Sequence, residues 1–259
     1  EQPAFLFQYD VGLGKSKMVL DILSHRMTVG DLSGPTLILA PAAVNLDGWQ
    51  EQIAEHAPHL TSVALVGARN ERHALLGRRA DVYLLNYAGL QSFMTQHNKS
   101  KKCMELVKNQ AEEFARRFGA VVFDESHLAG NHRSLTYAMC KPISRAIPFR
   151  YALTATLFGQ DPHAAWSQFD LVDHGETLGR TLGIFRVALF SPEQNYWSGG
   201  VDWKFRRAMK DKLALMLRHR SLRYEADECM DLPEIVRVTR RVPMPASITE
   251  HYEQVISTL

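Results

Sequence analysis

Short apolar runs alternate with amphipathic stretches along the first two thirds of the chain. The runs are bounded by turn-forming residues, and the stretches between them repeat apolar side chains at helical spacing. Continuous apolar runs are typical of strands that are buried on both faces of a parallel sheet. The pattern predicts strands at 3–8, 36–40, 62–66, 81–85, 120–123 and 151–154, and helices that include 17–26 and 164–172.

This alternation predicts an α/β fold, in which helices cover both faces of a mostly parallel sheet. After residue 175 the alternation stops, and glycines, a basic stretch and then prolines follow. We therefore predict two parts: residues 1–175 as the sheet domain, and residues 176–259 as an appended helical segment with a crossing strand or linker. The polar stretch 97–102 is predicted to be a loop.

A glycine-rich turn lies between the first predicted strand and the first predicted helix. Its sequence is GLGKS, from Gly12 to Ser16, and Tyr9 stands where the longer form of this motif has glycine. Glycines let successive backbone N–H groups point at one anion, and the helix N-terminus favours negative charge. We expect Lys15 to reach the β- and γ-phosphates and the Ser16 hydroxyl to bind Mg²⁺. The alternative interpretation is a structural glycine turn with a surface lysine.

Two adjacent carboxylates, Asp124 and Glu125, directly follow the apolar strand 120–123. Phosphoryl transfer to water needs one carboxylate in the metal shell and another to orient the water. We therefore predict Asp124 as a Mg²⁺ ligand and Glu125 as the base that positions water. The alternative is a helix cap with acidic residues in the first turn.

Two threonines, Thr154 and Thr156, follow the next strand. They could transmit the state of the nucleotide to a bound nucleic acid, or they could cap the following helix. The sequence alone leaves both interpretations open.

The net charge of +2 conceals a strongly basic stretch. Residues 1–203 carry a net charge of −1, residues 204–223 carry +7, and residues 224–259 carry −4. Such a stretch favours a surface that faces a polyanion. The alternative is a solvated amphipathic helix, because apolar residues recur there at helical spacing: Phe205, Met209, Leu213 and Met216.

Composition and cysteine usage exclude several classes of protein. No run of about 18 apolar residues is present, so we expect no membrane-spanning helix. The three cysteines are far apart, form no CxxC pair and are odd in number, which argues against a zinc knuckle or a disulfide framework. The chain therefore has the composition of a globular protein from a reducing compartment.

The order of these motifs resembles the first RecA-like lobe of a superfamily-two helicase, most closely of the Swi/Snf-type DNA translocases. Residues 10–16 are similar to their DEMGLGKT motif, and 39–41 with Trp49 to their APxSxxxxW segment. Residues 124–131 (DESHLAGN) resemble DEAHRIKN, and 153–166 resemble LTGTPLQNxxxELW. Residues 222–223 and 231–233 resemble the LRR…LP segment that closes their first lobe.

The resemblance implies a RecA-like lobe at 1–175, a Swi/Snf-type helical insertion and exit segment at 176–259, and ATP with Mg²⁺ as cofactors. The implied nucleotide-binding residues are Gly12, Leu13, Gly14, Lys15, Ser16 and Lys17, with Ser16 and Asp124 at the metal. The implied catalytic residues are Lys15, Asp124, Glu125 and His127. The implied partner is duplex DNA, held through its phosphates by Pro41, Ala42, Asn86, Tyr87, Thr154, Thr156, Arg206, Arg207 and Lys210.

The resemblance also implies a second RecA-like lobe, which carries an arginine finger and lies outside residues 1–259. Without it, we expect the chain to be inactive in ATP hydrolysis. The implied location is the cytoplasm of a bacterium or a phage-infected host, or the nucleus in a eukaryote.

Several residues depart from the Swi/Snf pattern, namely Ser126 for Ala or Gly, Ala155 for Gly and Leu157 for Pro. They leave the choice open between Swi/Snf-type proteins and neighbouring families such as restriction-enzyme or phage-borne motor subunits. One alternative function is an RNA helicase lobe of the same superfamily. The other is a non-catalytic, nucleotide-gated nucleic-acid-binding module.

Overall fold

The computed structural model describes residues 2–100, 102–159, 161–197, 199–229, 238–240, 242 and 245–257. The chain divides into two compact units, Glu1–Cys229 and Met230–Leu259. The second unit contains the helix α11, Ala246–Ser257. The LP segment at 231–233 lies outside the described residues. The predicted division at residue 175 stays a prediction.

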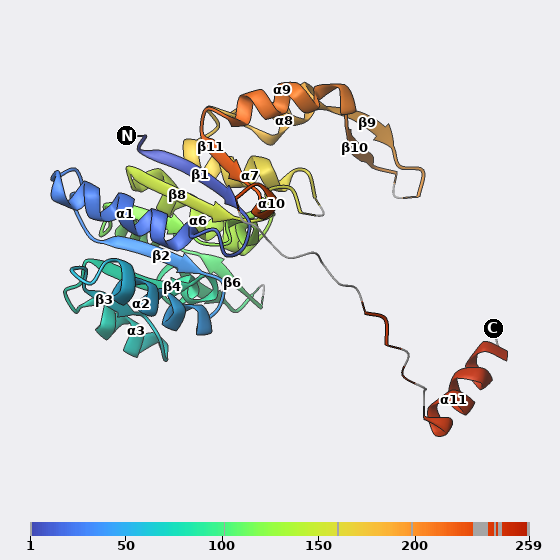
Figure 1. Cartoon of the computed structure of the whole chain (residues 1–259), viewed down its shortest axis with the longest axis horizontal. Coiled ribbons are helices and arrows are strands. Elements are labelled where there is room, and N and C mark those ends of the chain that lie inside the picture. The colour runs from blue at the N-terminus through green and yellow to red at the C-terminus, as the bar shows by residue number, and fades with distance from the viewer. Residues whose placement is uncertain are drawn as a thin grey trace. The chain divides into compact units, whose positions relative to one another are not determined.

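A seven-stranded parallel sheet forms the centre of the first unit, in the order β11-β1-β8-β7-β2-β4-β3 (Figure 1). This arrangement confirms the predicted α/β fold with a parallel sheet. Its strands are β1 Ala4–Tyr9, β2 Thr36–Ala40, β3 Ser62–Ala64, β4 Val82–Asn86, β7 Ala120–Phe123, β8 Phe149–Thr154 and β11 Ser221–Tyr224.

Alternate side chains of each central strand fill two separate hydrophobic cores, one on each face. Leu37 and Leu39 of β2 belong to the core packed by the later helices, whereas Ile38 belongs to the core packed by α1 and α2. Each fully buried aliphatic side chain contributes about 1.5–3 kcal/mol relative to exposure. The covering helices are α1 Lys15–Thr28, α2 Val44–His56, α3 Arg69–Leu76, α4 Gln91–Met94, α5 Lys108–Ala115, α6 Leu135–Ala146 and α7 Ala164–Asp173.

An insertion of helices and a β-hairpin separates α7 from the last strand of the sheet. It comprises α8 Leu182–Leu189, the hairpin β9 Phe190–Gln194 and β10 Val201–Phe205, a 3₁₀ turn η3 Arg207–Met209 and α9 Lys210–Leu217. Figure 1 shows these elements extending from one edge of the sheet. The chain then returns as β11, which pairs with β1, and continues into α10, Ala226–Cys229.

The predicted loop at 97–102 is wrong in part. Its first residues lie in β5 Thr95–Asn98, which pairs antiparallel with β6 Cys103–Leu106. The polar composition of this hairpin reflects its exposure, because its strands lie outside the central sheet. In the described part of the chain, no helix is both long enough and apolar enough to cross a membrane.

Candidate nucleotide-binding site

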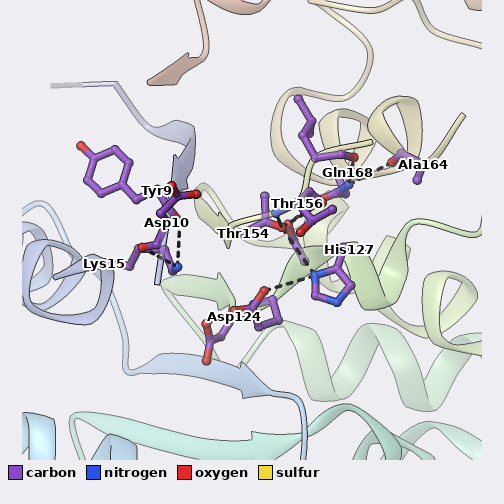
Figure 2. A network of polar contacts seen from close by, with 12 residues as sticks. Tyr9, Asp10, Lys15, Asp124, His127, Thr154, Thr156, Ala164 and Gln168 are labelled. Atoms are coloured by element: carbon purple, nitrogen blue, oxygen red, sulfur yellow. Dashed lines mark hydrogen bonds and ion pairs between the residues drawn. The ribbon is translucent and has the colours of Figure 1, made fainter. Parts of the chain in front are cut away.

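The predicted chemical groups meet at the carboxyl ends of three neighbouring strands, β1, β8 and β7 (Figure 2). Lys15 follows β1, Asp124 follows β7, and Thr154 is the last residue of β8. Parallel strands present their carboxyl ends at one edge of the sheet, where α/β proteins bind ligands. The topology therefore brings together residues that are more than one hundred positions apart.

The glycine turn leaves the N-terminus of α1 open to an anion. Gly12 and Gly14 have φ angles of 88° and 73°, in the left-handed region that side chains other than glycine rarely adopt. Gly14 is the N-cap of α1 and provides no side-chain cap, and the first turn holds no acidic residue. The first N–H groups of a helix lack partners within the helix, so this turn can donate them to a phosphate.

The Lys15 ammonium is bonded to the backbone that precedes the turn. Its Nζ donates to the carbonyl oxygens of Tyr9, at 2.8 Å, and Asp10, at 3.3 Å. Lys17 instead forms an exposed ion pair with Asp21 at 2.6 Å, so its ammonium points to another partner. The Ser16 hydroxyl has no hydrogen-bond partner among the described residues, which leaves it available to a ligand.

Both carboxylate oxygens of Asp124 accept hydrogen bonds. Oδ2 accepts from the indole N–H of Trp49 at 2.9 Å, and Oδ1 accepts from the backbone N–H of Glu125 at 3.0 Å. Burial raises the pKa of Asp124, and the charge of Glu125 raises it further. The Trp49 bond and the charge of Lys15 oppose that rise in pKa. Each oxygen retains a second lone pair for a metal ion or a metal-bound water.

Glu125 occupies the N-cap position of a short helix, but its side chain does not cap that helix. It precedes the short 3₁₀ helix η2, Ser126–Ala129, with φ at 47° and with no side-chain cap bond. Its Oε2 lies 3.2 Å from Nδ1 of His127 instead. The position therefore agrees with the helix-cap alternative, whereas the side chain of Glu125 makes no capping bond.

In the described part of the chain, neither threonine caps a helix, because α7 begins at Ala164 after the N-cap His163. Thr154 Oγ1 accepts from the backbone N–H of Thr156 at 3.0 Å and lies 3.5 Å from Nδ1 of His127. This contact joins the end of β8 to the segment after β7. The capping interpretation that the sequence left open is thus excluded.

A buried glutamine makes a second connection between the same segments. The Ser126 hydroxyl donates to Oε1 of Gln168 at 2.6 Å, and Nε2 of Gln168 donates to the carbonyl of Leu157 at 2.7 Å. Ser126, the departure from the Swi/Snf pattern, thus has a specific partner on α7. No pattern in the sequence singles out Gln168, because its partners come from two other segments.

The residues expected at a nucleic acid differ in exposure. Tyr87 is buried, and its hydroxyl donates to the carbonyl of Asp124 at 2.8 Å, and Thr154 is also buried. Neither side chain therefore offers an exposed surface in this structure, and their contact with nucleic acid stays a prediction. The other residues that are expected at a nucleic acid are exposed or half-buried: Pro41, Ala42, Asn86, Thr156, Arg206, Arg207 and Lys210.

The model of the SNF2-related domain matches residues 2–258. The chain belongs to the SNF2-related domain family.

Relatives of this SNF2-related domain include phage, bacterial and eukaryotic proteins. Putative protein p41 of Acyrthosiphon pisum secondary endosymbiont phage 1 is 26% identical over 93% of this chain. The putative ATP-dependent helicase/translocase YwqA of Bacillus subtilis is 25% identical over 95% of it. The chain spans 51% of the length of the phage protein and 24% of that of the bacterial one.

Two solved structures share the fold of this SNF2-related domain. The Sulfolobus solfataricus SWI2/SNF2 ATPase core domain is 19% identical, with a TM-score of 0.61, and covers 98% of this chain and 46% of its own. The same core in complex with dsDNA is 20% identical, with a TM-score of 0.60, and covers 86% of this chain and 40% of its own. These similarities confirm the RecA-like fold.

Trp49 has a role in this SNF2-related domain that its apolar spacing does not reveal. It is buried in the core beneath α2, as its position on the apolar face predicts, yet its indole N–H is bonded to the Asp124 carboxylate. A hydrogen bond to a charged acceptor is stronger than one to a neutral acceptor. Trp49 therefore favours the ionised form of Asp124.

We expect Trp49→Phe to reduce the free energy of unfolding by more than Trp166→Phe does. The Trp166 indole donates to the uncharged carbonyl of Gly179 at 2.9 Å, and both tryptophans are mostly buried, so the two substitutions remove the same volume. The bond contributes about 1.5–3 kcal/mol at a charged acceptor and about 0.5–1.5 kcal/mol at a neutral one. Urea unfolding at pH 7.5 measures the difference.

The pH dependence gives this comparison its control. The Trp49 bond stabilises the ionised carboxylate, so its contribution is present above the pKa of Asp124 and is lost as the pH falls through that raised pKa. The excess destabilisation in Trp49→Phe should therefore shrink as the pH is lowered toward the titration of Asp124. Equal, pH-independent destabilisation in both variants would contradict a charged acceptor at Trp49.

Proposed function

We propose that this chain is the ATP-binding lobe of an ATP-dependent DNA translocase or helicase, which couples ATP hydrolysis to movement on DNA. The observation that carries the proposal is the meeting of Lys15 with Asp124 and Glu125 at one edge of the sheet. The charge of Lys15 is near enough to lower the pKa of Asp124. An ammonium beside paired carboxylates, at an open helix N-terminus, suits a nucleotide with its metal ion.

The residues present fit Mg²⁺·ATP. The backbone of Gly12 to Ser16 and the first turn of α1 would hold the phosphates, while the free Ser16 hydroxyl and Asp124 would hold the metal ion. Mg²⁺ commonly binds proteins through one or two such groups together with substrate phosphates. When bound, it would neutralise the negative charge of the phosphates.

We assign the handling of the attacking water to Glu125 and His127. Glu125 Oε2 belongs to a side chain that is about one quarter exposed, at 28%, and can accept a proton from a water that it orients. His127 lies between Glu125 and Thr154, and Thr154 is bonded to the exposed Thr156. This chain of contacts supports a link between hydrolysis and a nucleic acid at the surface of Thr156.

The basic stretch supports duplex DNA as the partner, but only half of its charges are available. Lys204 pairs with Glu193, Arg206 donates to the carbonyls of Val187 and Ala188, Arg220 pairs with Glu176, and Arg223 pairs with Glu225. Four exposed cations on and beside α9 have no partner in the described part of the chain: Arg207, Lys210, Lys212 and Arg218.

Such cations would contact phosphates without reading the sequence, which suits a motor that moves along its track. A second RecA-like lobe would complete the nucleotide site, consistent with relatives much longer than this chain. We place the protein in the cytoplasm of a bacterium or of a phage-infected host, or in the nucleus if its source is eukaryotic.

We expect reversal of Arg207 and Lys210 to Glu to weaken binding to unrelated DNA duplexes equally. Each phosphate that the protein no longer neutralises removes about 0.9 from the slope of log K against log salt, so the double variant should flatten that slope by about two. Fluorescence anisotropy at several salt concentrations measures the slope.

The matched control is reversal of Arg78 and Arg79, two exposed arginines on the turn before β4. It makes the same change in net charge away from α9 and should leave the slope nearly unchanged. An unaltered slope in the Arg207 and Lys210 variant would show that α9 presents only a solvated face.

A further inference from the structure

The last strand along the chain, β11, pairs with β1, the strand that leads into the glycine turn Gly12 to Ser16, the proposed phosphate loop. Leu6 to Tyr9 of β1 pair in parallel with Ser221 to Tyr224 of β11. The rings of Tyr9 and Tyr224 meet edge to face, with centroids 5.1 Å apart. The two strands therefore reach the same edge of the sheet side by side.

Asp10 continues this connection beyond the paired strands. Its backbone N–H donates to the carbonyl of Tyr224 at 3.2 Å, and its Oδ2 accepts from the backbone N–H of Ala226 at 3.0 Å. Ala226 is the first residue of α10. The carboxylate of Asp10 thus caps the helix that begins directly after β11.

The other side of Asp10 contacts the phosphate loop. Its carbonyl oxygen and that of Tyr9 both accept hydrogen bonds from the ammonium of Lys15 (Figure 2). A phosphate oxygen is a stronger, charged acceptor for an ammonium than a backbone carbonyl is. A nucleotide that draws Lys15 to its phosphates therefore removes two bonds that restrain Tyr9 and Asp10.

We propose that Asp10 is a positioning residue. Binding of a nucleotide at the phosphate loop weakens the hydrogen bond by which Asp10 caps α10. The coupling rests on the proposed nucleotide site. Along the chain, α10 lies between the basic element α9 and the unit that begins at Met230. Asp10 therefore links the nucleotide to the segment that leads out of the sheet domain, through a residue that does not itself contact the nucleotide.

The exposed thiol of Cys229, at the end of α10, provides a probe of this helix. Cys103 is also exposed and is replaced in a Cys103→Ser background. Cys140 is buried, and burial raises the pKa of its thiol, so it reacts slowly. The measurement is the rate of maleimide labelling of Cys229, with and without a saturating, non-hydrolysable ATP analogue and Mg²⁺.

We expect the analogue to accelerate labelling of Cys229 in the parent protein. Loss of one hydrogen bond corresponds to about a two- to tenfold change in an opening equilibrium. Asp10→Ala should label faster without nucleotide and should lose most of the response to it. Asp10→Asn keeps an acceptor oxygen and should keep the response.

Ala226→Pro tests the same bond from the other side, outside the phosphate loop. Proline lacks the N–H that Asp10 accepts, and the first turn of a helix tolerates it. It should behave like Asp10→Ala. A parent rate that is insensitive to the analogue, or variants that keep the full response, would overturn the proposal.

Nucleotide binding is measured separately in each protein, by the thermal shift with the analogue. A shift without a labelling response would reject the coupling while leaving the nucleotide site in place. Absence of any shift in the parent protein would instead reject the nucleotide site, and with it the coupling that depends on it.

Discussion

Residues 1–259 on their own are expected to bind Mg²⁺·ATP but to hydrolyse it at close to the background rate, with or without DNA. Negative charge spreads over the γ-phosphate oxygens during transfer, and an arginine from outside the phosphate loop stabilises it by about 10³–10⁵ in rate. Lys15, whose charge lowers the pKa of Asp124, belongs to the phosphate loop itself and therefore cannot serve as that arginine. Release of phosphate under steady-state conditions measures the rate.

If a second RecA-like lobe follows residue 259 in the full gene product, restoring it should bring back DNA-stimulated hydrolysis. Glu125→Gln in that longer protein should abolish hydrolysis again while retaining the volume of the side chain. Rapid DNA-stimulated hydrolysis by residues 1–259 alone would mean that an arginine within this lobe, or from a second copy, serves the site. The two-lobe mechanism would then be wrong.

Lys15→Ala is expected to abolish the stabilisation of the fold by Mg²⁺·ATP. A ligand at about one hundred times its Kd stabilises the folded state by about 2.7 kcal/mol, which for a domain of this size shifts Tm by several degrees. Without the ammonium, the phosphates lose their charged partner. Thermal unfolding with and without Mg²⁺·ATP measures the effect.

The matched control for this substitution is Lys99→Ala, at an exposed position between β5 and β6. It should leave the shift intact. The unliganded Lys15→Ala protein should unfold near the parent temperature, because the carbonyls of Tyr9 and Asp10 can bond to water instead. An undiminished shift with Mg²⁺·ATP in Lys15→Ala would rule out the phosphate-loop assignment.

The central strands could be predicted from the sequence because their burial on both faces leaves continuous apolar runs. The strand at 120–123 has the predicted bounds, and β8 begins two residues earlier than predicted. The edge strand β11 lacks that signal, because three of its four residues are exposed and its composition is mixed. Pairing with β1, which is distant in sequence, defines it as a strand.

The sequence also predicts which residues of the candidate site come together, but not which partners they have. Parallel topology places Lys15 and Asp124 at one edge of the sheet, and this follows from the order of strands and helices. The partners of these groups do not follow from the sequence, because Trp49 and Gln168 reach the site through the packing of α2 and α7. The burial of Tyr87 and Thr154 likewise depends on tertiary contacts.

At Glu125, the residue that would best stabilise the backbone differs from the residue that the proposed chemistry needs. A non-glycine residue in the left-handed region of φ and ψ is strained by roughly 1–3 kcal/mol, and glycine would relieve that strain. Glycine, however, has no carboxylate. If Glu125 orients the water, selection for a more stable lobe and selection for a faster motor favour different residues there. Retention of glutamate at this position would then be a mark of selection for turnover, readable in any descendant sequence.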